Sequence, residues 1–349
     1  MLPWYCTREE VKAELDYKET ARADRRIDRA VESASRTVEG LLHRRFYPEL
    51  GTRYFDWPNA QRARPWRLWL DDNELISVTS LMSGGVTIAA GDYFLEPNTS
   101  GPPFRRLELD LDSNAAFGGG DTHQRDIAIT GLWGYRDDET PLGATVGALD
   151  AAETGIDVDA ATSAEVGVGS LLRIDDERVL VTGRAQLDTG QTVGADLAAQ
   201  ANAVTVQVGS GAAFASGETI LVDSERMLIV DIAGNSLTVK RGWDGSVLAT
   251  HTTGAAVYAP RTLTVRRGVL GTTAATHASS ATVHRWDPPP PVRELSLAEA
   301  VNQILQGQAG WGKAGRGGLS QRESEQIALQ RLRERVYTSH GRKARLRGV

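Results

Sequence analysis

Two stretches of the sequence repeat each other: GSLLRIDDERVLV at residues 169–181 and GETILVDSERMLIV at residues 217–230. They match at an offset of 48 residues, and both carry an Asp-x-Glu-Arg unit at their centre, Asp175 to Arg178 and Asp223 to Arg226. Apolar residues flank this acidic unit on both sides, a pattern typical of two short strands joined by a turn. Each stretch is therefore predicted to form a β-hairpin.

A second pair of repeats follows with a different offset. The hexapeptide LTVKRG at residues 237–242 matches LTVRRG at residues 263–268, and Ala-Thr-His recurs at 249–251 and 275–277, in both cases at an offset of 26. A tandem array would keep one offset throughout. The order along the chain is instead first half, first half, second half, second half.

This order predicts two nested β modules. One complete module spans residues 204–258 and is inserted into another, whose halves are residues 156–184 and 261–286. Two modules with crossed partners fit the sequence equally well, but nesting needs shorter connections.

The N-terminal part reads as helices followed by short strands. Thr7 and Glu10 have capping-box spacing, which marks the start of a short helix. From Asp24 to Arg45, apolar residues recur at steps of three and four and predict a long amphipathic helix, which Pro48 prevents from continuing. Period-two patterns then predict strands at 66–70, 75–81, 93–95, 107–111 and 127–133.

The C-terminal part begins with four prolines, residues 288–291, which predict a polyproline II segment. Helices are expected at 295–305 and from Ser320, a second capping-box position, to Tyr337. Residues 307–313 between these helices fit most of a phosphate-binding P-loop. A helix precedes them, however, and Ala314 replaces the magnesium-binding hydroxyl residue, so an NTPase is disfavoured.

Composition and charge set further limits. The net charge of −6 argues against a general nucleic-acid binder, but residues 313–349 carry ten Lys and Arg against three Asp and Glu, so they have a charge of +7 and the rest −13. The basic tail is expected either to meet an acidic partner or phosphates, or simply to solubilise a helix end. Cys6 is the only cysteine, and no signal peptide or apolar run of membrane length is visible, which predicts assembly in a reducing cytoplasm without a membrane.

Few residues are candidates for chemistry. The paired Asp and Glu of each Asp-x-Glu-Arg unit have the oxygen ligands for a cation, but hairpin turns in which an Arg pairs with the acid are favoured. His251 and His277 recur with their modules and are interpreted as a shared structural solution. We therefore predict no catalytic residues, no metal site and no cofactor, and hence no enzyme.

Four N-terminal segments together resemble one known family. They are Asp24 to Leu41, the Arg45-Phe46-Tyr47-Pro48 that follows, the strand region Leu68 to Leu81, and Gly131-Leu-Trp-Gly-Tyr135. In this order they are similar to the head-to-tail adaptor (head-completion, connector) proteins of long-tailed bacteriophages. The resemblance covers residues 1 to about 140 and, more weakly, 288–349.

The resemblance implies a non-enzymatic virion protein at the neck. Such proteins form a homo-oligomeric ring, commonly a dodecamer, under the portal protein, and the ring receives the stopper or tail-completion protein. The double-stranded DNA genome passes through its channel. The portal or DNA-channel interface is then expected at the C-terminal basic residues: Arg331, Arg333, Arg335, Arg342, Lys343, Arg345 and Arg347. Trp66 and Trp69 are most simply sheet packing, with one ring left for a possible subunit interface.

The fold class predicted is α+β: a helical adaptor core with short strands, plus an inserted all-β region of two nested repeat modules. The expected divisions are an adaptor domain at 1–142, the β insertion at 143–287, and adaptor helices with a basic tail at 288–349. The insertion departs from the short family pattern. An alternative function is another virion or tail-associated protein whose β modules bind a glycan or a neighbouring capsid protein, and an enzyme of unrecognised type is the third.

Overall fold

The computed structural model describes residues 1–15, 24–58, 64–99, 101–308 and 318–342. Contacts divide the chain into two compact units: unit 1 contains residues 1–38, 139–269 and 273–339, and unit 2 contains residues 39–138, 270–272 and 340–349. These units do not follow the expected divisions, because residues 39–138 separate from the N-terminal helices.

The predicted fold class is wrong in its emphasis on a helical core. Strands make up 36% of the structure and helices 22%, with three sheets, one of ten strands, and five helices among the described residues. The amphipathic stripe of the long N-terminal helix is real, but the short strands after it build a β core of their own, and the modules join in one large sheet.

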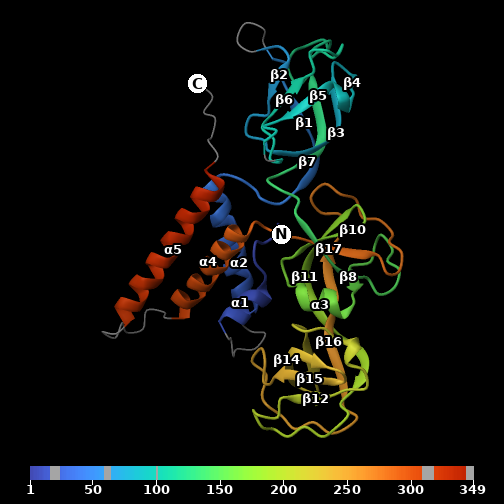
Figure 1. Ribbon diagram of the computed structural model, residues 1–349, viewed down its shortest axis with the longest axis vertical. Helices are drawn as coiled ribbons and strands as arrows, with labels where there is room; N and C mark the ends of the chain where they lie inside the picture. The colour runs from blue at the N-terminus through green and yellow to red at the C-terminus, as the bar shows by residue number, and fades with distance from the viewer. Residues whose placement is uncertain (16–23, 59–63, 100, 309–317, 343–349) are drawn as a thin grey trace. The chain divides into compact units, whose positions relative to one another are not determined.

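The helices of unit 1 come from both ends of the chain (Figure 1). Ile27 and Val31 of α2 share a buried cluster with Ala300 and Ile304 of α4, and Arg333 of α5 is ion-paired to α4. Their bounds are α1 Arg8–Glu14, α2 Asp24–Leu42, α4 Pro290–Gln308 and α5 Gly318–His340; the short α3, Ala160–Glu165, lies in the β region.

Two details of the C-terminal helices correct the sequence interpretation. The polyproline II prediction fails because α4 begins at Pro290, where the fixed φ of proline suits the first helical turn and its missing N–H is not needed. The capping box at Ser320 is wrong as well, since α5 already begins at Gly318. The capping box of Thr7 and Glu10 at α1 is confirmed.

The β region of unit 1 is a single ten-stranded sheet. Its strand order is β12-β15-β14-β13-β16-β11-β10-β17-β8, with β9 also paired to β16. The strands are β8 Glu139–Ala144, β9 Gly155–Asp157, β10 Leu171–Ile174, β11 Glu177–Thr192, β12 Thr205–Gln207, β13 Thr219–Val222, β14 Glu225–Ala233, β15 Ser236–Lys240, β16 Ala256–Arg266 and β17 Thr282–Trp286, with a 3-10 turn at Gly211–Ala213.

Strand pairing in this sheet is the one that nesting requires. In the outer module, with halves 156–184 and 261–286, β10 pairs with β17, and β9 and β11 pair with β16. In the inner module, residues 204–258, the order is β12-β15-β14-β13. The first half of the outer module therefore pairs with its own second half, although the inner module lies between them in the sequence. The long β16 runs from the end of the inner module into the outer module and pairs with β11.

Unit 2 holds two smaller antiparallel sheets around one core. One has the order β1-β7-β3-β4 and the other β2-β6-β5. The fully buried Leu75, Leu107, Ile127 and Trp133 belong to the shared cluster between them. The strands are β1 Glu49–Phe55, β2 Arg67–Trp69, β3 Leu75–Ser83, β4 Val86–Ile88, β5 Tyr93–Glu96, β6 Arg106–Leu109 and β7 Ile127–Trp133, with a 3-10 turn at Ala90–Asp92.

We expect Gly131→Ala to destabilise unit 2, whereas Gly51→Ala, at the facing register position, should be nearly neutral. A Cβ at Gly131 on β7 would overlap the carbonyl oxygen of Ser77, while a Cβ at Gly51 meets nothing within 4 Å. The expected loss at Gly131 is about 1–3 kcal/mol of the free energy of unfolding, measured by urea denaturation. Equal effects of the two substitutions would contradict the close approach of β3 and β7.

Candidate functional site

Each β module closes one eleven-residue loop around a buried glutamate. The outer-module loop, residues 267–277, connects β16 to β17, and the inner-module loop, residues 241–251, connects β15 to β16. Glu177 and Glu225, the glutamates of the repeated Asp-x-Glu-Arg units, have side chains that are 0% exposed. The two halves of each repeat meet at this residue.

Five hydrogen-bond contacts surround each glutamate. Glu177 accepts from Nε and Nη2 of Arg267, both at 2.7 Å, and from the backbone N–H groups of Gly268 at 2.8 Å and Ala275 at 3.0 Å. Nε2 of His277 lies 2.9 Å from the same carboxylate. A buried charge costs several kcal/mol unless it is paired and its lone pairs are filled, and this arrangement meets both conditions.

The inner module repeats this geometry. Glu225 accepts from Nε and Nη2 of Arg241 at 2.7 Å and from the N–H groups of Gly242 and Ala249, both at 2.9 Å, with Nε2 of His251 at 3.0 Å. The first, second, ninth and eleventh residues of each loop therefore converge on one carboxylate. We call this arrangement the glutamate clasp.

The arginine of each clasp also holds a second loop. Arg267 donates to the carbonyl oxygens of Asp150 and Glu153, both at 2.9 Å. The corresponding Arg241 donates to Ala198 at 3.1 Å and Ala203 at 3.0 Å. Each guanidinium group thus donates both to the buried carboxylate and to the backbone of a second loop. A lysine at either position would be a poor substitute, because its single ammonium group lacks the planar, forked donors of arginine.

Each clasp histidine bridges two carboxylates. Nδ1 of His277 lies 2.8 Å from Asp175, and Nδ1 of His251 lies 2.7 Å from Asp223, while the Nε2 atoms face the glutamates. Asp175 and Asp223 stand at the hairpin turns with φ of +50° and +51°, a conformation that Asp tolerates better than most residues. The acidic turn is therefore a structural position, as the sequence indicated.

Hydrogen bonding outweighs burial in setting the pKa of the clasp glutamates. Burial alone raises the pKa, but the donors from Arg267, Ala275, His277 and Gly268 lower that of Glu177 to about 2, from an ordinary 4.5. The equivalent donors around Glu225 lower its pKa to about 2 as well. Both carboxylates are consequently charged over the whole physiological range.

The tips of the two loops contact other parts of the chain. In the inner-module loop, Asp244 lies 2.8 Å from Nζ of Lys12 on α1, and Lys12 also lies 2.7 Å from Asp24 at the start of α2. At the tip of the outer-module loop, residues 270–272 belong to unit 2, and within that unit the carbonyl oxygen of Leu270 accepts from the N–H of Leu50 on β1 at 2.8 Å. Asp244 and Leu270 have matching φ values of +49° and +54°. One loop conformation thus serves two different docking contacts.

Sequence reasoning placed the hairpins correctly but missed the arginines. The acid of each unit pairs with Arg267 or Arg241 from the other half of the module, and Arg226 pairs instead with Asp244 at 3.0 Å. The signal was present, because both arginines lie in the matched LTVKRG and LTVRRG hexapeptides. A third repeat, Thr-Val-Gly-Ala at 145–148 and 192–195, begins the two loops whose carbonyl oxygens the arginines bind.

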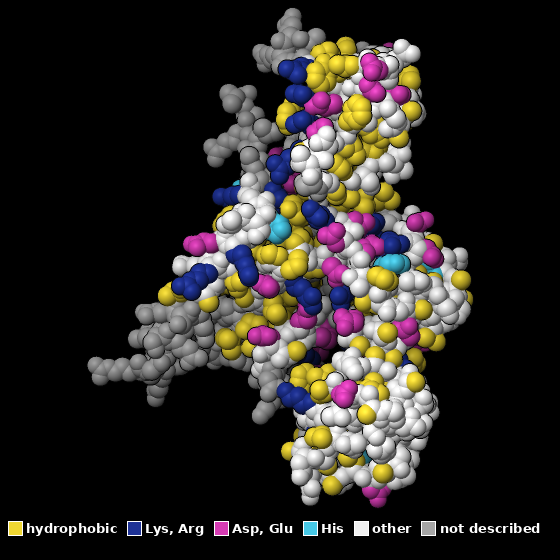
Figure 2. Space-filling view, viewed as in Figure 1, with side chains coloured by type: hydrophobic (Ala, Val, Ile, Leu, Met, Phe, Trp, Pro, Cys, Tyr) yellow, Lys and Arg dark blue, Asp and Glu magenta, His cyan; other side chains and the backbone are white. Residues whose placement is uncertain are grey.

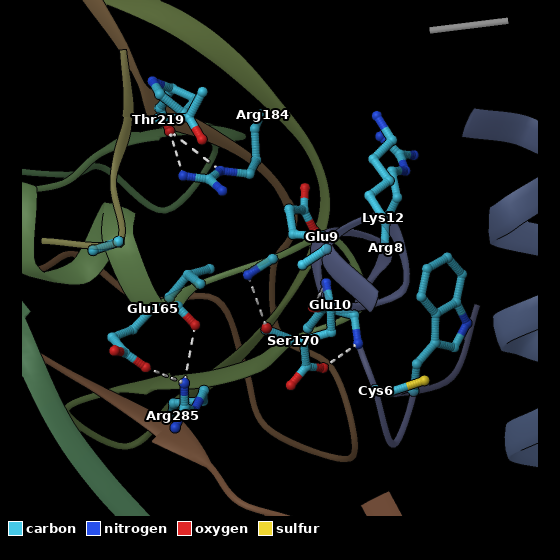
Figure 3. A pocket seen from close by; sticks show the side chains of 18 of the residues that line it. Cys6, Arg8, Glu9, Glu10, Lys12, Glu165, Ser170, Arg184, Thr219 and Arg285 are labelled. Atoms are coloured by element: carbon cyan, nitrogen blue, oxygen red, sulfur yellow. Dashed lines mark hydrogen bonds and ion pairs between the residues drawn. The ribbon is translucent and has the colours of Figure 1, made fainter. Parts of the chain in front are cut away.

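A cavity of about 370 Å³, lined by both polar and apolar side chains, lies in unit 1 beside α1 (Figure 3). Arg184 on one wall donates to the carbonyl oxygens of Ser163 at 2.6 Å and Pro260 at 3.3 Å, and Arg285 pairs with Glu165 at 3.1 Å. These guanidinium groups hold the wall itself together. Among the described residues, no group of three or more His, Cys, Asp or Glu side chains is placed to hold a metal ion.

The predicted basic interface is divided by the structure. Arg333 and Arg335 are paired to Glu299 and Glu294 of α4 at 2.6 and 2.9 Å, and Arg342 contacts His43. Figure 2 shows Lys and Arg side chains interspersed with Asp and Glu on the visible face. Arg331 is exposed and has no ion pair within the described part of the chain. The remaining predicted residues, Lys343, Arg345 and Arg347, lie outside the described residues.

The two tryptophans of the possible subunit interface lie in unit 2 and differ in exposure. Trp66 packs partly against the unit 2 core, under the guanidinium groups of Arg64 and Arg67. Trp69 on β2 is 54% exposed. Of the two, Trp69 therefore presents the larger apolar surface to solvent.

Comparison with known proteins adds no assignment: the chain matches no protein-family model, no curated protein and no solved structure. Within the described ranges, none of the helices is both long and apolar enough to cross a membrane.

We expect Glu177→Gln and Glu225→Gln each to lower the free energy of unfolding by about 3–5 kcal/mol, because each leaves a buried arginine without its counter-charge. Their pKa values of about 2 also fix a pH dependence. The stability contributed by the charged carboxylates is complete above pH about 4.5 and is lost as the pH falls toward about 2, on the order of 3 kcal/mol for each.

Urea denaturation between pH 7 and about 2 measures both effects. The difference in the free energy of unfolding between the native protein and the double variant E177Q/E225Q should become smaller as the pH falls. Asp231→Asn, an exposed acid on the same strand as Glu225, is the matched control and should change little. A difference in the free energy of unfolding that stays constant with pH would refute the stabilising role of the charged glutamates.

Lys12→Met should loosen the inner-module loop from the helices. The substitution leaves Asp24 and Asp244 without their shared cation, at an expected cost of about 1–3 kcal/mol. Hydrogen exchange at residues 243–246 should accelerate, whereas Arg29→Met on the exposed face of α2 should leave it unchanged. Unaltered exchange in the Lys12 variant would show that the bridge does not hold the loop.

Proposed function

We propose that the protein is a structural component of the neck of a long-tailed bacteriophage virion. Copies form the head-to-tail adaptor ring between the portal protein and the stopper or tail, around the channel through which the double-stranded DNA genome passes. The observation that carries this proposal is the shared core of the chain ends: Val31 of α2 packs in one cluster with Ala300 and Ile304 of α4.

This core matters because it brings together the two parts of the sequence that resemble the adaptor family. Residues 24–41 carry the N-terminal part of that resemblance, and residues 288–349 its weaker C-terminal part. Arg26 of α2 also donates to the carbonyl oxygen of Ile304 at 2.8 Å. The two ends of the chain are thus packed together, and the β region lies between them in the sequence.

An assembly role also agrees with the way in which the buried charged side chains are bonded within the protein. Glu177 and Glu225 are fully engaged in fixing loops, and Arg184 is bonded to carbonyl oxygens of its own cavity wall. Such groups stabilise a scaffold and do not converge on an open position for a substrate. We therefore propose a non-enzymatic role.

Among the basic residues, Arg331 is the described one best suited to contact the portal or the DNA. It is exposed on α5, while Arg333 and Arg335 on the same helix are paired to α4. Charged contacts of this kind are individually weak, about 0.2–1 kcal/mol, but a ring repeats them in every subunit.

The test combines the full-length protein with portal-bearing, DNA-filled heads and images the particles. We expect a ring of copies at the portal vertex and severalfold weaker attachment of R331E at low salt, with the difference shrinking at high salt. R29E, an exposed charge reversal on α2, is the control and should attach normally. Copies scattered over the capsid, or absent from the portal vertex, would overturn the proposal.

A further inference from the structure

The outer face of the three-stranded sheet in unit 2 carries two large exposed aromatic side chains among charged residues. Its inner face buries Leu68, Leu107 and Leu109, so the alternate residues of each strand point outward. Among these outward residues, Trp69 is 54% exposed and Phe94 is 53% exposed. Two large aromatic side chains on a single small sheet need an explanation.

The strand register arranges this face in two rows. In the first row Trp69, Arg106 and Glu96 are neighbours across the sheet; in the second row Arg67, Glu108 and Phe94 are neighbours. The charges are linked by ion pairs, with Arg67 and Arg106 each 2.8 Å from Glu108. The guanidinium of Arg106 also lies 5.5 Å from the centre of the Trp69 ring. Each row thus holds one aromatic residue, one cation and one anion.

We propose that this face binds the same face of a second copy of the chain. A two-fold axis that runs across the strands, in the plane between two such faces, places each row over the other row. Arg106 then meets Glu108 of the second copy and Glu108 meets its Arg106, while the position of Arg67 falls over that of its Trp69. The alternative axis, along the strands, sets Arg106 against itself and is disfavoured by repulsion. The face is therefore complementary to itself in one orientation.

The contact is small, so a weak association is expected. Three strands about 4.8 Å apart and about four residues long give roughly 200 Å², far below the ~800 Å² per partner of a standard interface. Association is therefore expected only at high concentration, on the order of 0.1–1 mM protein. A two-fold contact closes on itself and cannot build a ring, so this inference does not rest on the proposed function.

Two charge reversals test the proposal on the full-length protein. R106E and E108R each give positions 106 and 108 of the central strand β6 the same sign, so each variant should repel its own copy and associate at least about tenfold more weakly than the native chain. Mixed in equal amounts, the two variants carry opposite faces and should associate at least as well as the native protein. Sedimentation equilibrium across the concentration series measures all four samples, and thermal unfolding checks that both variants are folded.

Rescue in the mixture supports the two-fold contact, because a merely structural defect of the sheet would persist there. A native protein that stays monomeric throughout the concentration series overturns the proposal. So does association that is equal in the native chain and in both single variants, since that result would place the contact on another surface. Neither outcome bears on attachment to portal-bearing heads, so the two proposals fail separately.

Discussion

The β region depends on one physical constraint: a carboxylate removed from water must have its charge and its lone pairs satisfied by the protein. Glu177 and Glu225 meet this constraint with an arginine, two backbone N–H groups and a histidine each. These donors come from the second half of the module, whereas the glutamate belongs to the first. The carboxylate therefore joins two segments that are distant in the sequence, most of all in the outer module.

The same constraint explains why the repeat keeps its form in both modules. A loop of eleven residues is fixed at its first, second, ninth and eleventh positions, so only its tip is free to vary. The tip holds Trp243 and Asp244 in one module and Val269 and Leu270 in the other. One tip contacts a helix through Lys12, and the other contacts the edge of a strand at Leu50. Duplication thus supplies a rigid frame with an exchangeable contact.

Periodicity in the sequence was enough to place most elements, since the steps of α2 and the alternation of β7 depend only on neighbouring residues. Periodicity led to an overestimate of the helical core, because it does not show how many short strands pair with one another in a single sheet. The polyproline II prediction was wrong because Pro290 can open a helix when the residues after it are helical. The pairing of Glu177 with Arg267 spans 90 residues, and periodicity carries no information at that range.

Tertiary context likewise decided the candidate interface residues. Arg333 and Arg335 looked equivalent to Arg331 in the sequence, but acidic residues of α4 pair with the first two. In a basic cluster, the arginines without an ion pair inside the protein are therefore the better candidates for contact with a partner. Trp69, by contrast, stays exposed in the folded protein. Its neighbour across the sheet is the charged Arg106, whose guanidinium lies over the Trp69 ring.

The glutamate clasp is expected to hold both loops as firmly as the strands hold the sheet. Residue-resolved hydrogen exchange of the native protein tests it most directly. The N–H groups of Gly242, Ala249, Gly268 and Ala275 should exchange as slowly as those in the centre of β10 and β14. Exchange of these four groups as fast as that of exposed loop residues would contradict the account.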